Sequence, residues 1–145
     1  MSGPKKPVQS RGRGKTLRSS SHRGSLPEAQ QVIEGLEFAR QAARIAHEHR
    51  SEDVVVLDLR GICSVADFFV IATGTSDRQL RAVADHIDEY ARTVGQARYG
   101  VSGYEASTWI LADYVDVVIH LFDPQKREYY DLELLWGDAP RVAWE

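Results

Sequence analysis

The chain has 145 residues, one cysteine and a formal net charge of −3, which fits one domain with a single core and excludes an internal disulfide. Its apolar runs are too short to cross a bilayer, so we do not expect an integral membrane protein. Residues 1–26 carry seven basic side chains and no acid, whereas the rest carries 11 bases against 21 acids. Such an acidic body repels nucleic-acid phosphates and suits a basic protein partner.

Residues 1–24 are predicted to be a basic, disordered tail, and residues 25–145 the globular domain. The tail is rich in Gly, Ser, Pro, Lys and Arg, so it cannot bury enough surface to offset the entropy lost on ordering. The tail could contact rRNA, or it could simply be a solvated arm. An organellar transit peptide is the competing interpretation, but no amphipathic period is visible. We therefore expect a bacterial cytoplasmic protein.

The first half of the domain is predicted to contain a helix followed by two strands. A capping box at residues 25–28 marks the start of the helix, and a single apolar stripe extends it to about residue 49. Residues 54–59 and 68–73 are almost continuously apolar, as in strands that are covered on both faces. A second capping box, Ser76 to Gln79, opens the helix with the clearest period, which Gly95 ends.

The second half is predicted to contain three strands and a final helix. Residues 98–103 form a weak strand, and residues 108–113 and 117–122 form a hairpin. A last helix should run from Pro124, capped by Asp123, to about Trp136. This order predicts an α/β (α+β) fold with a five-stranded mixed sheet flanked by helices. The strands before and after the second helix are expected to pair in parallel, and the last three to include antiparallel pairs.

Gly74, Thr75 and Ser76 lie between a strand and a helix, where phosphate-binding turns occur. The lysine of a P-loop is missing, and no Asp-x-Asp pair is present for a two-metal site. Ser76 acting as a helix cap explains these residues more simply. We therefore predict no enzyme activity, no metal and no cofactor; the alternative is a small nucleotidyltransferase or phosphate-binding enzyme that uses Gly74–Ser76.

Other reactive side chains give weaker signals. Cys63 with His86 or His120 is poor evidence for a nucleophile, and His120 lies within an apolar strand, which favours a structural role. The carboxylates at strand ends suit either turn chemistry or an acidic patch that faces a basic partner; these are Asp58, Asp67, Asp113 and Asp116. Adjacent Tyr129 and Tyr130 cannot both face inward on one helix, so an aromatic contact surface is expected nearby.

Several motifs follow one another in a fixed order over residues 28–137. They are Asp58, Ser64-x-x-Asp67, Ala72-Thr-Gly-Thr-Ser76, Ala84-Asp85-His86, Gly103 with Trp109, Asp113 with Asp116, Val118-Ile-His120 and Arg127-x-x-Tyr130-x-Leu-Glu-x-Leu-Trp136. This pattern resembles the ribosomal silencing factor family, also called the Iojap family. One departure is Val115, where the turn often has glycine. The resemblance implies a fold related to nucleotidyltransferases that lacks their catalytic carboxylates.

The resemblance also implies a binding function. Members of the family dock on protein uL14 of the large ribosomal subunit, prevent the small subunit from joining and thereby repress translation. Relatives suggest a homodimer, and a role in large-subunit maturation is a further alternative. From the residues we predict a docking set of aromatic and acidic side chains: Trp109, Asp113, Tyr114, Asp116, Tyr129, Tyr130 and Glu133.

Overall fold

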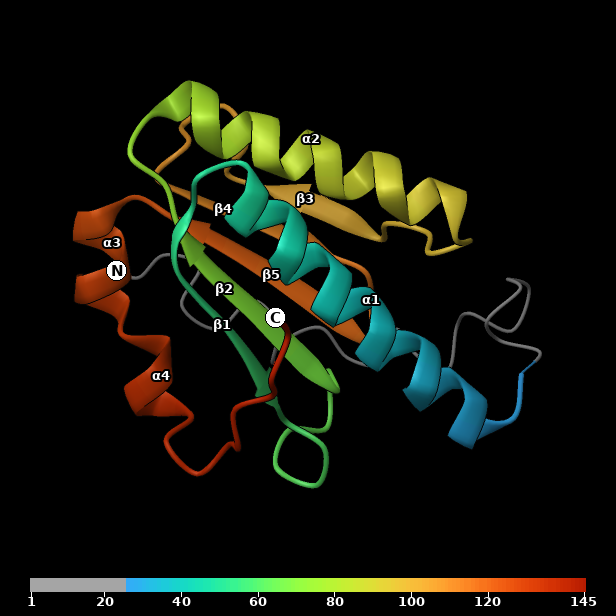
Figure 1. Cartoon of the computed structure of the whole chain (residues 1–145). Helices are drawn as coiled ribbons and strands as arrows, with labels where there is room; N and C mark the ends of the chain where they lie inside the picture. Colours follow the sequence, from blue (N-terminus) through green and yellow to red (C-terminus); the bar gives the residue numbers. More distant parts are fainter. Residues whose placement is uncertain (1–25) are drawn as a thin grey trace.

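A computed structural model describes residues 26–145, so the predicted tail and Ser25 lie outside the described residues. The elements are α1 (Glu28–Glu48), β1 (Glu52–Asp58), β2 (Phe68–Thr73), α2 (Asp77–Thr93), β3 (Gly100–Ser102), β4 (Trp109–Asp113), β5 (Val117–Phe122), α3 (Pro124–Tyr130) and α4 (Leu132–Leu135). Helices α1 and α2 lie together on one face of the sheet, and α3 and α4 lie beside β1 and β2 near one end of the strands (Figure 1). No helix among these residues is long and apolar enough to cross a membrane.

The sheet has five strands in the order β1-β2-β5-β4-β3, and it is mixed as predicted. Strand β2 pairs with β5 in parallel, whereas the other three pairs are antiparallel. The predicted pairing of the strands on either side of α2 is wrong. Strands β2 and β3 run in the same direction, but β5 and β4 lie between them because the β4–β5 hairpin is inserted into the sheet.

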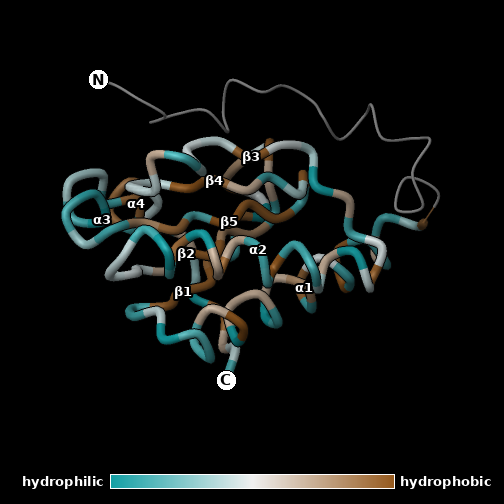
Figure 2. Tube along the Cα trace, turned by 90° about the horizontal axis from the view of Figure 1, so that it is seen from above, coloured by the Kyte–Doolittle hydropathy of each residue, from teal (hydrophilic) through white to brown (hydrophobic). Residues whose placement is uncertain are grey.

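The core has two layers, one on each face of the sheet. The strands between these layers are coloured largely as hydrophobic in Figure 2. Alternate strand residues point to opposite faces, so continuously apolar strands serve both layers. On one face, small α1 residues such as Ala42 and Ala46 let the helix lie close to the strands. On the other face, Phe69, Trp109 and Phe122 pack beneath the segment that follows β5. This second layer positions α3 and α4.

Helix α2 begins as its capping box predicts, because Ser76 Oγ accepts a hydrogen bond from the main-chain N–H of Gln79 at 3.1 Å. Helix α1 begins differently. It follows Pro27 without a side-chain cap, and the side chain of Gln31 donates to the carbonyl of Leu26 at 2.8 Å. The predicted final helix is also wrong in one respect. Asp131 adopts a left-handed φ of 44°, which ends α3 and starts α4.

The last residues lack a periodic pattern, and the sequence does not predict their position. They run back along the free edge of β1. Arg141 forms a bridge with Leu57, and the N–H of Val142 donates to the carbonyl of Val56 at 2.9 Å. The indole of Trp144 donates to the carbonyl of Val54 at 3.2 Å. This segment therefore covers an edge that would otherwise expose unpaired main-chain groups.

The β4–β5 turn is centred on Val115, which has a φ of 74°. The N–H of Asp116 donates to the carbonyl of Tyr114 at 2.9 Å, which closes a three-residue γ-turn around Val115. A β-branched residue is strained at positive φ, at a cost of roughly 1–3 kcal/mol. The side chain of Val115 therefore carries strain that glycine would not.

We expect Val115→Gly to stabilise the fold by about 1 kcal/mol. Glycine removes the strain but loses part of the gain because it makes the unfolded chain more flexible. Urea denaturation measures the change, with Val101→Gly on the exposed part of β3 as a destabilising control. An unchanged or lower midpoint for Val115→Gly would show that the turn is not strained.

Candidate functional site

The structure divides the predicted docking set into two groups. Asp113, Tyr114 and Asp116 lie at the β4–β5 turn, whereas Tyr130 and its neighbours in α3 and α4 follow the other end of β5. A strand of six residues spans roughly 20 Å. The two groups therefore lie at opposite ends of β5.

Four members of the set are buried, which corrects the expectation that they form an exposed surface. Their exposed fractions are 6% for Trp109, 4% for Asp113 and 2% for both Tyr114 and Asp116. Trp109 lies 4.5 Å from the ring of Tyr130, and its indole N–H donates to Nδ1 of His120 at 3.2 Å. These side chains are part of the core, and a docking role for them stays a prediction.

Tyr114 anchors the hairpin to α2. Its hydroxyl donates to Asp88 at 2.8 Å, and Arg92 donates to the same carboxylate at 2.9 Å. Burial raises the pKa of Asp88, but the hydrogen bonds from Tyr114 and Arg92 outweigh it, so the net pKa of this carboxyl is lowered. Burial, followed by the bond to Asp88, raises the pKa of Tyr114. The hydroxyl thus stays protonated and remains a hydrogen-bond donor.

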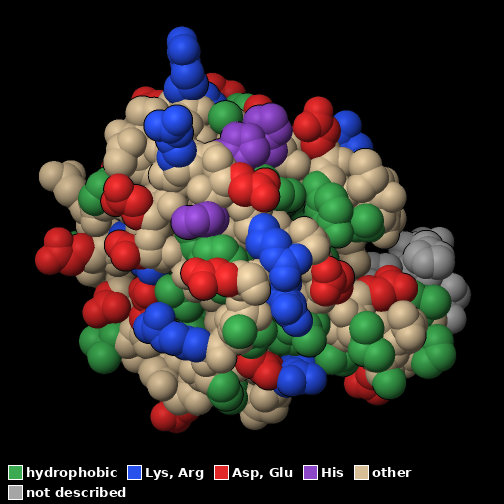
Figure 3. Space-filling model, viewed as in Figure 1, with side chains coloured by type: hydrophobic (Ala, Val, Ile, Leu, Met, Phe, Trp, Pro, Cys, Tyr) green, Lys and Arg blue, Asp and Glu red, His purple; other side chains and the backbone are tan. Residues whose placement is uncertain are grey.

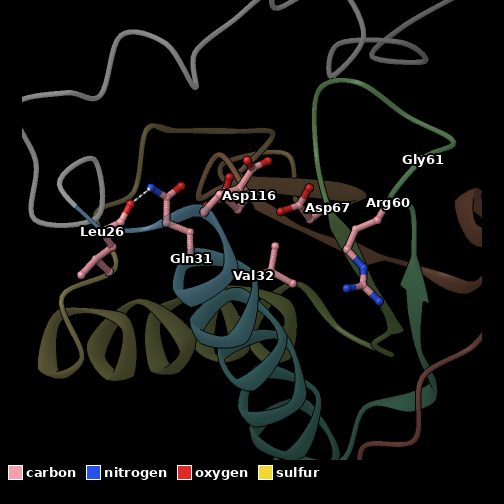
Figure 4. A pocket seen from close by; sticks show the side chains of 8 residues that line it. Leu26, Gln31, Val32, Arg60, Gly61, Asp67 and Asp116 are labelled. Atoms are coloured by element: carbon pink, nitrogen blue, oxygen red, sulfur yellow. Dashed lines mark hydrogen bonds between the residues drawn. The ribbon is translucent and has the colours of Figure 1, made fainter.

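The strand-end carboxylates have different roles. Asp113 accepts from the N–H of Val115 at 2.7 Å, and Asp58 pairs with Arg60, with 2.6 Å between the carboxylate and Nη2; both are turn interactions. Asp67 and Asp116 instead lie side by side at a polar pocket of about 560 Å³ near the start of α1, with Arg60 on another wall (Figure 4). Within residues 26–145, no three His, Cys, Asp or Glu side chains are grouped to hold a metal ion.

The turn after β2 is explained by helix packing. The N–H and hydroxyl of Thr75 donate to the side chain of Gln79, at 2.7 and 3.1 Å. A Cβ added to Gly74 would lie 2.7 Å from Leu80 Cδ2, so glycine permits α2 to approach the sheet. The N–H groups of Thr75 and Gln79 are already occupied, which disfavours a phosphate site and leaves the enzyme alternative without support.

Apolar side chains are exposed on the two short helices at the other end of β5. Tyr129, Leu134 and Leu135 are 71%, 76% and 49% exposed, and we call these three residues the α3–α4 surface. Leu132 and Tyr130 pack against the sheet, whereas Tyr129, the neighbour of Tyr130, points away from it. Exposed apolar residues grouped on a surface are typical of a protein interaction site.

A half-buried ion pair links α3 to α4. Arg127 donates to both carboxylate oxygens of Glu133, at 3.1 and 2.7 Å, and to the hydroxyl of Thr73 at 2.7 Å. Burial raises the pKa of Glu133, but Arg127 outweighs it, and the net pKa is lowered. Glu133 was predicted as a contact residue, and the structure pairs it with Arg127. The docking roles of Glu133, Tyr129 and Tyr130 stay predictions.

The predicted docking set did not include Leu134 or Leu135. A signal was present, because Asp131 caps α4 through the N–H of Leu134 at 3.3 Å. An acidic cap three residues before two adjacent leucines indicates a new, short helix. Such a helix cannot bury both leucines together with Leu132.

The burial of His120 makes the stability of the fold depend on pH. Its ring is buried, its Nδ1 accepts from Trp109 and its Nε2 has no partner among the described residues. Burial lowers the pKa of His120 to about 3, whereas an unfolded chain has a histidine pKa of about 6.5. Between these values the unfolded state binds a proton that the folded state does not, so stability falls as the pH falls.

We therefore expect the free energy of unfolding to decrease by up to about 1.4 kcal/mol per pH unit below pH ~6.5. Urea denaturation at pH 7, 6 and 5 measures the slope. His120→Asn keeps an acceptor for Trp109 but does not titrate in this range, so its profile should be flatter. Equal slopes for the two proteins would contradict the assignment to His120.

The fold is that of a small α+β protein. The exposed apolar residues of the α3–α4 surface are typical of a protein that binds a partner. Residues 32–145 match the family model described as "Ribosomal silencing factor during starvation". The chain belongs to the ribosomal silencing factor family, as its motifs predict, and this is a family of translation regulators.

Two bacterial relatives and a solved structure illustrate the similarity. The ribosomal silencing factor of Halalkalibacterium halodurans is 40% identical over 109 residues, which cover 75% of this chain and 93% of that protein. The one from Bacillus subtilis is 43% identical over 99 residues, covering 68% and 84%. A crystal structure of a Chromobacterium violaceum protein superposes with a TM-score of 0.69 at 31% identity, covering 76% of this chain and 91% of that one.

Proposed function

We propose that the protein docks on the large ribosomal subunit at uL14 through its α3–α4 surface and sterically blocks the small subunit from joining. The observation that carries this proposal is the exposure of Tyr129, Leu134 and Leu135 on two short helices. Aromatic and large apolar side chains form the desolvated centre of protein interfaces. Family membership makes the ribosome the expected partner.

Charge supports the same assignment. Residues 27–145 carry 11 basic and 21 acidic side chains, and Glu128 and Asp131 are exposed beside the apolar residues. An acidic rim would steer the protein toward a basic ribosomal protein and away from the rRNA phosphates. Because the proposed action is steric occlusion, it needs no catalytic group and no cofactor, and it takes place in the bacterial cytoplasm.

Purified ribosomal subunits test this proposal. The protein should sediment with isolated large subunits and should reduce the amount of joined ribosomes when small subunits are added. Higher salt should weaken binding, because the rim contacts are charged. Unchanged subunit joining at saturating protein would refute occlusion. If the protein binds but joining is unchanged, the maturation role becomes the better explanation.

A further inference from the structure

Helix α4 is too short to be stable by itself. It has four residues, whereas an isolated helix shorter than about 12 residues is marginal in water. Two of its four residues, Leu134 and Leu135, are exposed, so they contribute little packing to the free protein. The position of α4 therefore depends on contacts made by its other residues and by its neighbours.

Apolar packing anchors α4 near both of its ends. Leu132 is 4% exposed and belongs to the second core layer. Trp136, one residue past the helix, packs edge-on against Phe69, with 6.0 Å between the ring centroids. Because apolar packing is not directional, these two anchors do not by themselves determine which way Leu134 and Leu135 point.

Arg127 in α3 supplies a directional contact to α4. Its Nε and Nη2 donate to the two carboxylate oxygens of Glu133, at 3.1 and 2.7 Å, and its Nη1 donates to the hydroxyl of Thr73 at 2.7 Å. Thr73 is the last residue of β2 and is 4% exposed. A guanidinium holds its donors in a rigid planar fork. One side chain therefore joins α3, α4 and the end of β2.

This ion pair is better shielded from water than an ordinary surface pair. The side chains of Arg127 and Glu133 are 12% and 22% exposed. Exposed ion pairs contribute little, because water screens the charges and both side chains lose rotamer freedom. A bidentate bond between shielded partners is stronger and holds one geometry. The fork is therefore suited to fixing the orientation of α4.

We propose that Arg127 is a positioning residue for docking: its bonds to Glu133 and Thr73 hold α4 so that Leu134 and Leu135 point outward before a partner binds. This inference rests on the proposed docking through the α3–α4 surface. Acidic and hydrophobic side chains lie together on this side of the molecule, at the left of Figure 3. A surface that is ordered in advance loses less entropy on association. Arg127 thus raises the affinity without touching the partner.

Hydrogen exchange in the free, full-length protein is the first test. Arg127→Lys keeps the positive charge but loses the fork. The N–H of Trp136 donates to the carbonyl of Leu132 at 2.9 Å. We expect this amide to exchange about tenfold faster in the variant, while the amides of β2 and β5 keep their rates. Arg60→Lys is the matched control, because Arg60 forms the same two-bond fork with Asp58 at the opposite end of β2 and should leave α4 unchanged.

Two outcomes of the exchange experiment would overturn the proposal. Unchanged exchange at Trp136 would show that the fork does not hold α4. Equal acceleration at Trp136 and in the core strands would show that Arg127 supports the whole fold and does not position α4 in particular.

Sedimentation with large subunits is the second test. We expect Arg127→Lys to weaken binding by about tenfold in the wild-type chain, but by about threefold or less in a chain that already carries Leu134→Ala. The effects are not additive because Arg127 acts through Leu134. Equal losses in the two backgrounds would contradict the positioning role. If the wild-type chain does not sediment with large subunits, the proposed docking itself fails, and the exchange result shows separately whether Arg127 orders α4.

Discussion

Trp109→Ala is expected to lower the free energy of unfolding by about 3–5 kcal/mol, the range for truncating a buried tryptophan. Trp109 is 6% exposed and contacts Phe122 and Tyr130, with ring centroids 4.8 and 4.5 Å away. Removing the indole leaves a cavity beneath α3 and also deprives His120 of its hydrogen-bond donor. Urea denaturation monitored by circular dichroism measures the loss.

Trp109→Phe separates packing from hydrogen bonding. Phenylalanine fills much of the cavity but cannot donate to His120, so we expect a smaller loss of about 1–2 kcal/mol. If Trp109→Ala instead keeps the wild-type midpoint but fails to bind large subunits, Trp109 is a contact residue and its place in the core is wrong. The same experiment therefore decides between the two roles that the sequence allows for this residue.

Most of the fold could be predicted because the signals are local. Strands β2 and β5 occupy the predicted residues, since both are uninterrupted apolar runs between polar turns. Ser76 caps α2 as its motif indicates. The break at Asp131 was missed because aspartate, unlike most residues, can adopt the left-handed region without glycine's signature in the sequence, which leaves only the cap as a signal. The path of the C-terminal segment along β1 depends on a bridge from Arg141 to Leu57, far away in the sequence.

The candidate site was harder to predict than the fold. A sequence in which aromatic and acidic residues are adjacent has the same pattern whether these residues contact a partner or contact each other within the fold. Tyr114 is buried because its hydroxyl reaches Asp88, 26 positions earlier in the chain, and sequence spacing cannot reveal this pairing. The exposure of Tyr129 was predictable from its adjacency to Tyr130, because neighbours on a helix point in different directions.

The turn at Gly74 also has two explanations that the sequence alone cannot separate. Gly74 looks like part of a phosphate-binding turn in the sequence, but its lack of a Cβ is needed for the approach of Leu80. Helix packing and ligand binding select the same residue for the same reason, which is the absence of a side chain. The sequence alone could therefore rank the two explanations but could not decide between them.

Tyr129→Ala and Leu134→Ala are each expected to weaken binding to the large subunit by about 2 kcal/mol or more, roughly 30-fold in Kd. These side chains are 71% and 76% exposed, so their removal should change the free energy of unfolding by less than about 0.5 kcal/mol. A loss of affinity without a loss of stability distinguishes a contact residue from a core residue such as Trp109. Sedimentation of the variants with large subunits measures the affinity.

Two matched controls lie elsewhere on the surface. Tyr99, next to β3, is 61% exposed, and Ile33, on α1, is 58% exposed. Their alanine variants remove a comparable apolar area from faces away from α3 and α4 and should leave subunit binding unchanged. If all four variants lose affinity equally, nonspecific hydrophobic contacts explain the binding. If only the control variants lose affinity, the docking surface lies at the α1–β3 side of the molecule, and the assignment to the α3–α4 surface is wrong.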